Sequence, residues 1–183
     1  MTATLDTIGD GAADLIARAV GGDESAFARI VAAHQRDLVR ICFVICGDQD
    51  IAEEAVAGAW SIAWRKLRTL REPERLRPWL TSVAANEARQ LLRRRHRRTV
   101  VELSVAPAAA WAQGHDPATH AADLDLANAL ARLDPDDRAL LALRYVAGFD
   151  SFEIARATGR SPSGTRARLA RLLERLRKEL GDD

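Results

Sequence analysis

The chain of 183 residues contains few sulfur-containing and few aromatic residues. It contains two cysteines, one methionine and one tyrosine, and only 5% of its residues are aromatic. Cys42 and Cys46 lie one helical turn apart in an apolar run, which favours two buried thiols and leaves a redox switch as the alternative. A zinc site would need more ligands than this spacing supplies.

Long apolar runs are also missing. The most apolar stretch, residues 41–46, is far too short to cross a bilayer. The first fifteen residues contain no basic stretch followed by an apolar core, so they do not resemble a secretory signal. We therefore expect a cytoplasmic protein without membrane insertion.

No constellation of catalytic or phosphate-binding residues appears. The four histidines form no cluster with other candidate groups, and no glycine-rich phosphate loop is present. The sequence therefore predicts neither an enzyme nor a bound cofactor or metal.

The formal net charge of only +1 is an average over opposed segments. Residues 65–98 contain twelve Lys and Arg against three Asp and Glu, whereas acidic residues gather near the N-terminus and in residues 116–137. Phosphate affinity follows the local patch, so this near-neutral chain can still bind nucleic acid.

The composition that is present predicts an all-α fold. Ala, Leu, Arg and Glu dominate, and β-branched runs with a period of two are absent. In the N-terminal half we expect helices over residues 12–20, 23–46 (with Asp23 as the cap), 50–67 (with Asp50 as the cap) and 79–98, with an irregular corner at 73–78.

The C-terminal part carries the signature of a helix-turn-helix. Asp150 and Glu153 form a capping box, and Gly159 ends a short helix that offers Phe152, Ile154 and Ala155 for packing. Ser161-Pro162 starts the next helix. That helix has a stripe for packing at Thr165, Leu169, Leu172, Leu176 and Leu180. Helices over 124–133 and 138–147 complete a four-helix unit, whose shape is suited to a DNA major groove.

Two segments resemble one family. LARLDPDDRALLALRYVAGFDSFEIARATGRSPSGTRARLARLLERLR, residues 130–177, is similar to the promoter-binding C-terminal domain of bacterial extracytoplasmic-function (ECF) sigma factors. In the other half, LIARAVGGDESAFARIVAAH, GDQDIAEEAV with AWRKL, and RPWLTSVAANEARQLLRRR resemble the core domain of the same family.

The resemblance implies two small helical domains joined by a flexible linker: a core domain over 1–98, a linker over 99–121 and a helix-turn-helix domain over 122–183. It implies binding to core RNA polymerase through the beta-prime clamp helices and the beta flap. It also implies binding to double-stranded promoter DNA and the melted non-template strand, and to an anti-sigma factor.

For polymerase docking, the resemblance indicates Glu53, Glu54, Trp60 and Trp64. The residues alone allow a simpler interpretation, in which the two glutamates stabilise the first turn of a helix and the tryptophans pack in the core. The family usually has a glutamine and an acidic residue where this chain has Ala57 and Gly58.

For the minus-ten element, the resemblance indicates Arg75, Arg77, Trp79, Asn86, Arg89, Arg93 and Arg94. Asn86 is expected to read a base through its amide, and Trp79 either stacks on opened bases or closes the corner. The arginine run at 93–98 is expected to grip duplex phosphates.

For the minus-thirty-five element, we expect contacts from Ser161, Ser163, Arg166, Ala167, Arg168 and Arg171. Arg166 and Arg171 would reach base edges or nearby phosphates, Arg168 a phosphate, and Ala167 a thymine methyl group. Two rival functions remain: a DNA-binding regulator that does not dock on polymerase, and a helical interaction protein, including a sigma-like chain retuned for another partner.

Overall fold

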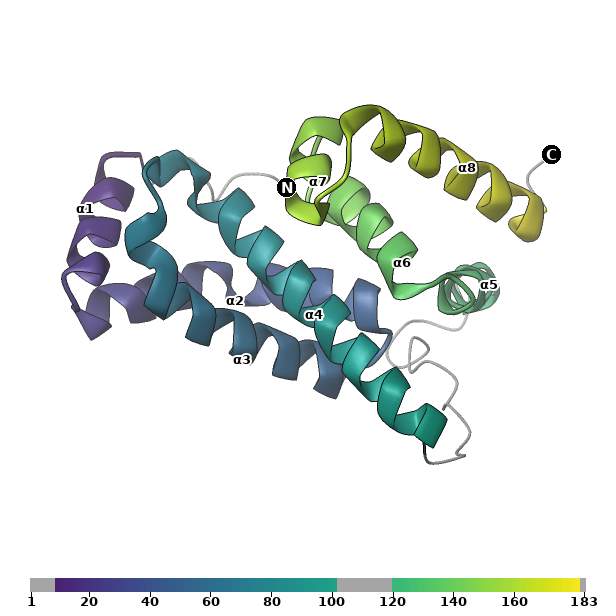
Figure 1. Ribbon diagram of the computed structural model, residues 1–183, viewed down its shortest axis with the longest axis horizontal. Helices are drawn as coiled ribbons and strands as arrows, with labels where there is room; N and C mark the ends of the chain where they lie inside the picture. The colour runs from purple at the N-terminus through teal and green to yellow at the C-terminus, as the bar shows by residue number, and fades with distance from the viewer. Residues whose placement is uncertain (1–8, 102–119, 182–183) are drawn as a thin grey trace.

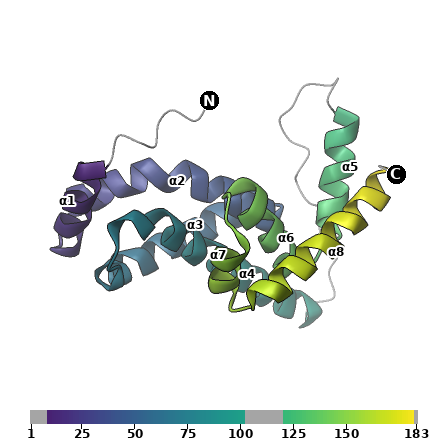
Figure 2. The same ribbon diagram turned by 90° about the horizontal axis from the view of Figure 1, so that it is seen from above.

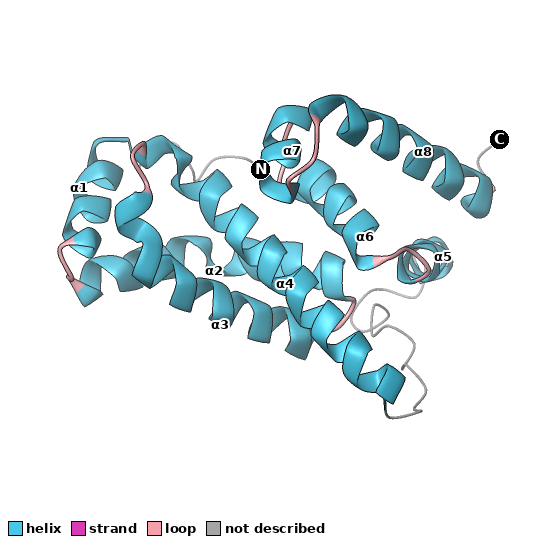
Figure 3. Ribbon diagram, in the orientation of Figure 1, coloured by secondary structure: helices cyan, strands magenta, loops and turns pink. Residues whose placement is uncertain are grey.

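A computed structural model describes residues 9–101 and 120–181 of the chain. Within these ranges every regular element is helical, as the all-α prediction required (Figure 3). Trp111 and most of the expected linker lie outside the described residues.

The N-terminal half begins with helices whose ends follow from local chemistry. The elements are α1 (Gly9–Val20), α2 (Glu24–Cys46) and α3 (Gln49–Lys66). Asp23 caps α2 as predicted, because its carboxylate accepts from the Ala26 amide at 3.0 Å. Gly47, at φ 72°, ends the same helix in the left-handed conformation that glycine tolerates.

The cap of α3 differs from the predicted one. Asp48, not Asp50, accepts from a backbone amide, that of Ile51 at 2.9 Å, so the helix begins at Gln49 and Asp50 lies inside its first turn. Asp48 and Asp50 both lie at the start of the predicted helix. Gly47 ends α2 in the left-handed conformation, and Asp48, the next residue, takes the cap position of α3.

A corner of two 3₁₀ turns, Leu67–Thr69 and Pro73–Arg75, leads into α4 (Leu76–Val101). This helix starts three residues earlier than expected and includes Pro78 in its first turn, where the missing proline N–H leaves no intrahelical bond unmade. α2, α3 and α4 pack together and α1 covers one end of the group (Figure 1). Many of the buried residues of α3 and α4 are alanines, namely Ala52, Ala55, Ala59, Ala63, Ala84, Ala85 and Ala88.

The C-terminal half consists of α5 (His120–Ala131), α6 (Pro135–Leu141) followed by one π-helical turn (Ala142–Val146), α7 (Ser151–Thr158) and α8 (Pro162–Leu180). The predicted capping box at Asp150 and Glu153 is confirmed. The expected continuous helix over 138–147 instead widens into a π turn, in which the Ala147 amide donates to the Ala142 carbonyl at 3.0 Å.

The packing stripe of α8 is confirmed at Thr165, Leu169, Leu172 and Leu176, whereas Leu180 is 39% exposed. One expectation for α7 is wrong: Phe152 is 64% exposed and does not pack in the core. α7 has only two turns, and its buried side is set by Ile154 and Ala155, which leaves Phe152 on the outside.

The two halves pack against each other. Their buried apolar side chains form one continuous cluster, and α6 and α7 lie on α2 and α4 while α8 forms an outer layer (Figures 1 and 2). The buried guanidinium of Arg138 joins them, because its Nε donates to the Ile45 carbonyl at 2.6 Å and its Nη1 to the Leu133 carbonyl at 3.0 Å.

Candidate nucleic-acid interface

One surface of α4 brings together three of the residues predicted for minus-ten DNA, namely Asn86, Arg89 and Arg93. Arg89 Nη1 donates to Asn86 Oδ1 at 2.9 Å, and Asn86 Nδ2 donates to the Ala157 carbonyl at 3.3 Å. The arginine thus holds the amide oxygen and leaves the amide NH2 directed away from α4. The amide NH2 of Asn86 is therefore the hydrogen-bond donor that links α4 to the end of α7.

The arginines of this surface meet a carboxylate that the sequence did not single out. Asp136 Oδ1 accepts from Arg89 Nε at 2.6 Å and from Arg93 Nη1 at 3.4 Å. The side chain of Arg89 is only 11% exposed and that of Asp136 is 35% exposed. The hydrogen bond from Arg89 is the main cause that lowers the pKa of Asp136 below its usual value, so the carboxylate is ionised at neutral pH.

The remaining minus-ten candidates are spread along α4 and its entrance. Arg75 is exposed and pairs with Glu72, and Arg94 is exposed and donates to Gln90 at 3.2 Å. Arg77 donates weakly to the Ala147 carbonyl at 3.4 Å. Trp79 is partly buried against the core, as the corner-closing interpretation expected.

The first turn of α8 is built around its cap. Ser161 Oγ accepts from the Gly164 amide at 3.1 Å, and a side chain at Gly164 would put its Cβ only 2.9 Å from that oxygen. A larger residue at position 164 would therefore require the Ser161 side chain to shift. Ser163 is exposed beside it.

The outer face of α8 presents Arg166, Ala167 and Arg171, which are all exposed. The Arg166 guanidinium lies 6.0 Å above the Phe152 ring, at the limit of a cation–π contact. The exposed phenylalanine thus supports a candidate DNA-reading arginine.

Arg168 is held differently from its neighbours. Its Nε donates to Asp137 Oδ1 at 2.5 Å, and its Nη2 pairs with Asp134 at 3.3 Å. The hydrogen bond to Asp137 is the main cause that raises the pKa of Arg168. Asp137 is almost fully buried and is also 3.8 Å from Arg175, so this pairing fixes α8 on the start of α6. A phosphate contact by Arg168 would have to coexist with this pairing.

The candidate polymerase-docking residues divide into buried and exposed ones. Trp60 is partly buried, donates to Gln35 Oε1 at 2.5 Å and packs edge-on against Phe27. Trp64 also contacts Phe27, with ring centroids 4.8 Å apart, but it is 41% exposed. Trp60 therefore serves the core, and Trp64 shows part of its ring to the outside.

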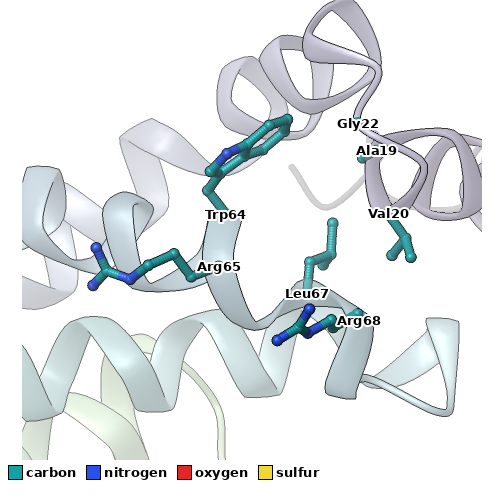
Figure 4. Close-up of a pocket in the computed structure, with 7 residues that line it drawn as sticks. All are labelled: Ala19, Val20, Gly22, Trp64, Arg65, Leu67 and Arg68. Carbon is teal, nitrogen blue, oxygen red and sulfur yellow. The ribbon is translucent and has the colours of Figure 1, made fainter.

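Trp64 lines a shallow pocket of about 390 Å³ between the end of α1 and the end of α3 (Figure 4). Ala19, Val20 and Leu67 add apolar lining, and Arg65 and Arg68 add basic groups. Because apolar and basic groups meet here, the pocket suits a partner with apolar and acidic side chains.

Glu53 and Glu54 lie in the second turn of α3, because the helix begins at Gln49. The expectation that they stabilise the first turn is therefore wrong. Glu53 accepts from Gln49 at 2.7 Å, and Glu54 pairs with Arg95 of α4 at 2.7 Å. On the same helix, a Cβ at Gly58 would approach Glu87 Oε2 to 3.3 Å, so the small residue allows close contact with α4.

The two thiols are buried, as expected. Burial raises the pKa of both, that of Cys46 to about 12, and Cys42 Sγ donates weakly to the Ala84 carbonyl at 3.6 Å. In the part of the chain that the structure describes, no three His, Cys, Asp or Glu side chains are grouped to hold a metal ion. None of the helices described is long and apolar enough to cross a membrane.

Two family models match the chain in order. Sigma-70 region 2 matches residues 30–98 and Sigma-70 region 4 matches residues 123–176. The chain is 31% identical over 166 residues to the RNA polymerase sigma factor CarQ of Myxococcus xanthus, which covers 88% of this chain and 92% of CarQ.

The probable RNA polymerase sigma factor RfaY of Xanthomonas campestris pv. campestris is 33% identical over 88% of this chain, but this match spans only 42% of the longer RfaY. Among solved structures, the sigma factor RpoE in complex with the anti-sigma factor NepR from Bartonella quintana has a TM-score of 0.68. At 22% identity, and with 86% of this chain and 98% of RpoE covered, that likeness supports the fold.

The two regions therefore define a sigma-70-type transcription initiation factor. Within that class, the chain belongs to the ECF sigma factors of RNA polymerase.

Proposed function

We propose that this ECF sigma factor reads its promoter with two separate helices and docks on core RNA polymerase through a third surface. It would act in the cytoplasm, where polymerase and promoter DNA meet, and without catalytic activity of its own. The single observation that carries the proposal is that both sigma regions occur in order in one chain, each with an arginine-rich helix surface.

The minus-ten site lies on α4, within a core domain over residues 1–98. Asn86 presents its NH2 to an acceptor on an opened base, and Arg89 fixes the orientation of that amide. Arg93 and Arg94 guide the backbone by charge, and Arg75, Arg77 and Trp79 border the entrance of the single strand. The assignment is supported by the way Arg89 and Asn86 are already joined.

The minus-thirty-five site lies on α8, within a helix-turn-helix domain over residues 122–183 that a linker over 99–121 connects to the core domain. Arg166 and Arg171 reach base edges or nearby phosphates, and Ala167 lies against a thymine methyl group. Ser161 and Ser163 contact the backbone at the first turn, and Arg168 adds a phosphate contact from its place beside Asp137.

Polymerase docking is proposed on the outer side of α3. Trp64 and the pocket beside it bind the beta-prime clamp helices together with Glu53 and Glu54, and Trp60 supports the surface from within. The helix-turn-helix domain contacts the beta flap. An anti-sigma factor is a further proposed partner, since a structural neighbour of this chain was solved with one.

The test is run-off transcription with core polymerase and this chain on a genomic promoter library. We expect defined start sites with the wild-type chain, and a loss of about fivefold or more in transcript with Asn86→Ala, because a good amide–base contact contributes about 1–3 kcal/mol. Asn128→Ala is the matched control, since it removes an exposed helical asparagine from α5.

The outcomes separate the parts of the proposal. If no defined transcript starts in the presence of the wild-type chain, the function itself is wrong, and tight operator binding without core polymerase would then favour a DNA-binding regulator. If Asn86→Ala and Asn128→Ala transcribe equally well, only the assignment of Asn86 fails.

A further inference from the structure

The acidic turn at the start of α6 lies against the proposed minus-ten surface. Asp136 accepts from Arg89 and Arg93 of α4, and its second oxygen is 4.0 Å from Arg160 Nη2. Asp136 belongs to the C-terminal half and stands 47 residues from Arg89 in sequence. One carboxylate of the helix-turn-helix half thus engages two arginines of the core half.

The base-reading amide is engaged from the same side. Asn86 Nδ2 donates to the carbonyl of Ala157, in the last turn of α7. Its oxygen accepts from Arg89, so both ends of the amide already have partners. Any base that approached Asn86 would have to displace the end of α7.

These contacts have the same chemistry as DNA. Arginine makes the same charge-assisted hydrogen bonds to a carboxylate as to a phosphate. A peptide carbonyl is an acceptor of the kind that a base edge offers to an asparagine NH2. Asp136 therefore stands where a backbone phosphate would be, and the Ala157 carbonyl stands where a base acceptor would be.

We propose that the C-terminal half occupies the minus-ten surface of the chain in the absence of DNA, so that single-stranded promoter DNA and the Asp136 turn compete for Asn86, Arg89 and Arg93. The proposal rests on the proposed function, because it takes these three side chains as the DNA contacts. It adds an internal competitor, which delays minus-ten binding until the halves separate.

The ion pairs that Asp136 makes with α4 can break and re-form. Arg93 is half exposed and Asp136 about one-third exposed, and ion pairs at such positions are weak and screened by salt. The apolar packing of α6 on α2 also holds the halves together. Asp136 therefore shifts the balance between closed and open forms and does not hold the closed form alone.

Two measurements on the full chain test the competition. The first is the affinity for a mixed-sequence, fluorescein-labelled single strand of about 12 nucleotides, within the range that single-strand sites accommodate. Asp136→Asn keeps the size of the side chain and removes its charge. If it raises the open fraction from about one tenth to about one half, the apparent affinity rises about fivefold.

Asp125→Asn is the matched control. It removes the same charge from the same half, and Asp125 is exposed on α5, whereas the ion pairs with Arg89 and Arg93 are made by Asp136. The general gain from losing one negative charge should appear in both variants, so only the excess in Asp136→Asn counts. An equal gain in the two variants would overturn the competition.

The second measurement is the radius of gyration by small-angle X-ray scattering, without DNA or polymerase. Asp136→Lys sets a like charge against Arg89 and Arg93 and is expected to enlarge the radius, whereas Asp125→Lys is not. An unchanged radius in Asp136→Lys would show that the turn does not control closure and would overturn the proposal.

The failures of the two proposals can be told apart. If Asp136→Lys opens the chain but Asp136→Asn binds the strand no better than its control, DNA does not use the covered surface and the competition is wrong. If the fivefold gain appears but the wild-type chain starts no transcript, the competition holds and the sigma function is wrong.

Discussion

The two proposed DNA-reading surfaces of this chain differ in how much of each is available. On α8, Arg166, Ala167 and Arg171 are exposed on the outer layer of the molecule. On α4, Asn86 and Arg89 are covered by α6 and α7 and hydrogen-bonded to them. The difference indicates that α8 can meet a DNA duplex while the proposed minus-ten surface of α4 is still covered.

Asp136 and Asp137 are neighbouring carboxylates in the first turn of α6, and each engages a different one of the two surfaces. Asp137 is buried and holds Arg168 in place, which fixes α8 within its own half. Asp136, one residue earlier, points to α4 and engages side chains that are proposed to contact DNA. Burial separates the two roles, because a buried pair is costly to break whereas a partly exposed one exchanges with solvent.

The largest expected effect comes from α7, which packs on both α4 and α8. Ile154 is fully buried in this helix. Ile154→Ala leaves a cavity, and we expect it to lower the free energy of unfolding by about 2–5 kcal/mol. Chemical denaturation followed by circular dichroism measures the change.

Ile154→Val is the control for this cavity and should cost only about 0.5–1.5 kcal/mol. If α7 supports both surfaces, Ile154→Ala should also weaken duplex binding by α8 and loosen the cover over Asn86. A loss of stability below about 1 kcal/mol would contradict the packing described for α7.

The second-largest expected effect concerns Arg171 on the exposed face of α8. Arg171→Ala should lose about 1–3 kcal/mol of discrimination between the preferred minus-thirty-five sequence and a substituted one, if Arg171 contacts a base. Duplex binding by fluorescence anisotropy measures it. Because Arg171 lies away from the α4 contacts, the loss should be the same in the Asp136→Asn background.

Arg177→Ala is the matched control, since it removes an exposed arginine from a later turn of the same helix. It should weaken binding slightly and equally on every sequence. If Arg171→Ala behaves in the same way, Arg171 contacts a phosphate and carries no sequence information.

Local features of the fold could be predicted from the sequence. The caps at Asp23, Asp150 and Ser161 were recognised because each depends on a few adjacent residues. The prediction of Asp50 as the cap of α3 is wrong, since Asp48 and Asp50 both suit a cap and the end of α2 at Gly47 decides between them. Phe152 was expected to pack because it is apolar, but a two-turn helix buries a single side.

The helix that carries the candidate minus-ten residues was predictable, but their contacts with the other half of the chain were not. Asn86, Arg89 and Arg93 were expected on one helix, and the structure brings them onto one surface. Their partner Asp136 was missed, because an ion pair across 47 residues leaves no periodic trace in a sequence. The acidic residues within 134–137 and the basic stretch at 89–98 were visible, and their opposite charges were the signal that could have suggested the contact.

The smallest effect concerns the inner side of α8. Thr165 is fully buried, and its Oγ1 has no hydrogen-bond partner among the described residues. An unsatisfied buried hydroxyl costs about 1–3 kcal/mol, and valine has the same shape without it. Thr165→Val should therefore raise the free energy of unfolding by about 1 kcal/mol and leave duplex binding unchanged, because the side chain faces away from the arginines. Thr165→Ser, which keeps the hydroxyl and loses the methyl group, should be less stable than the wild-type chain. A destabilised Thr165→Val would mean that the hydroxyl is hydrogen-bonded in solution. A polar contact would then help to hold the inner side of α8, as polar contacts hold the covered surface of α4.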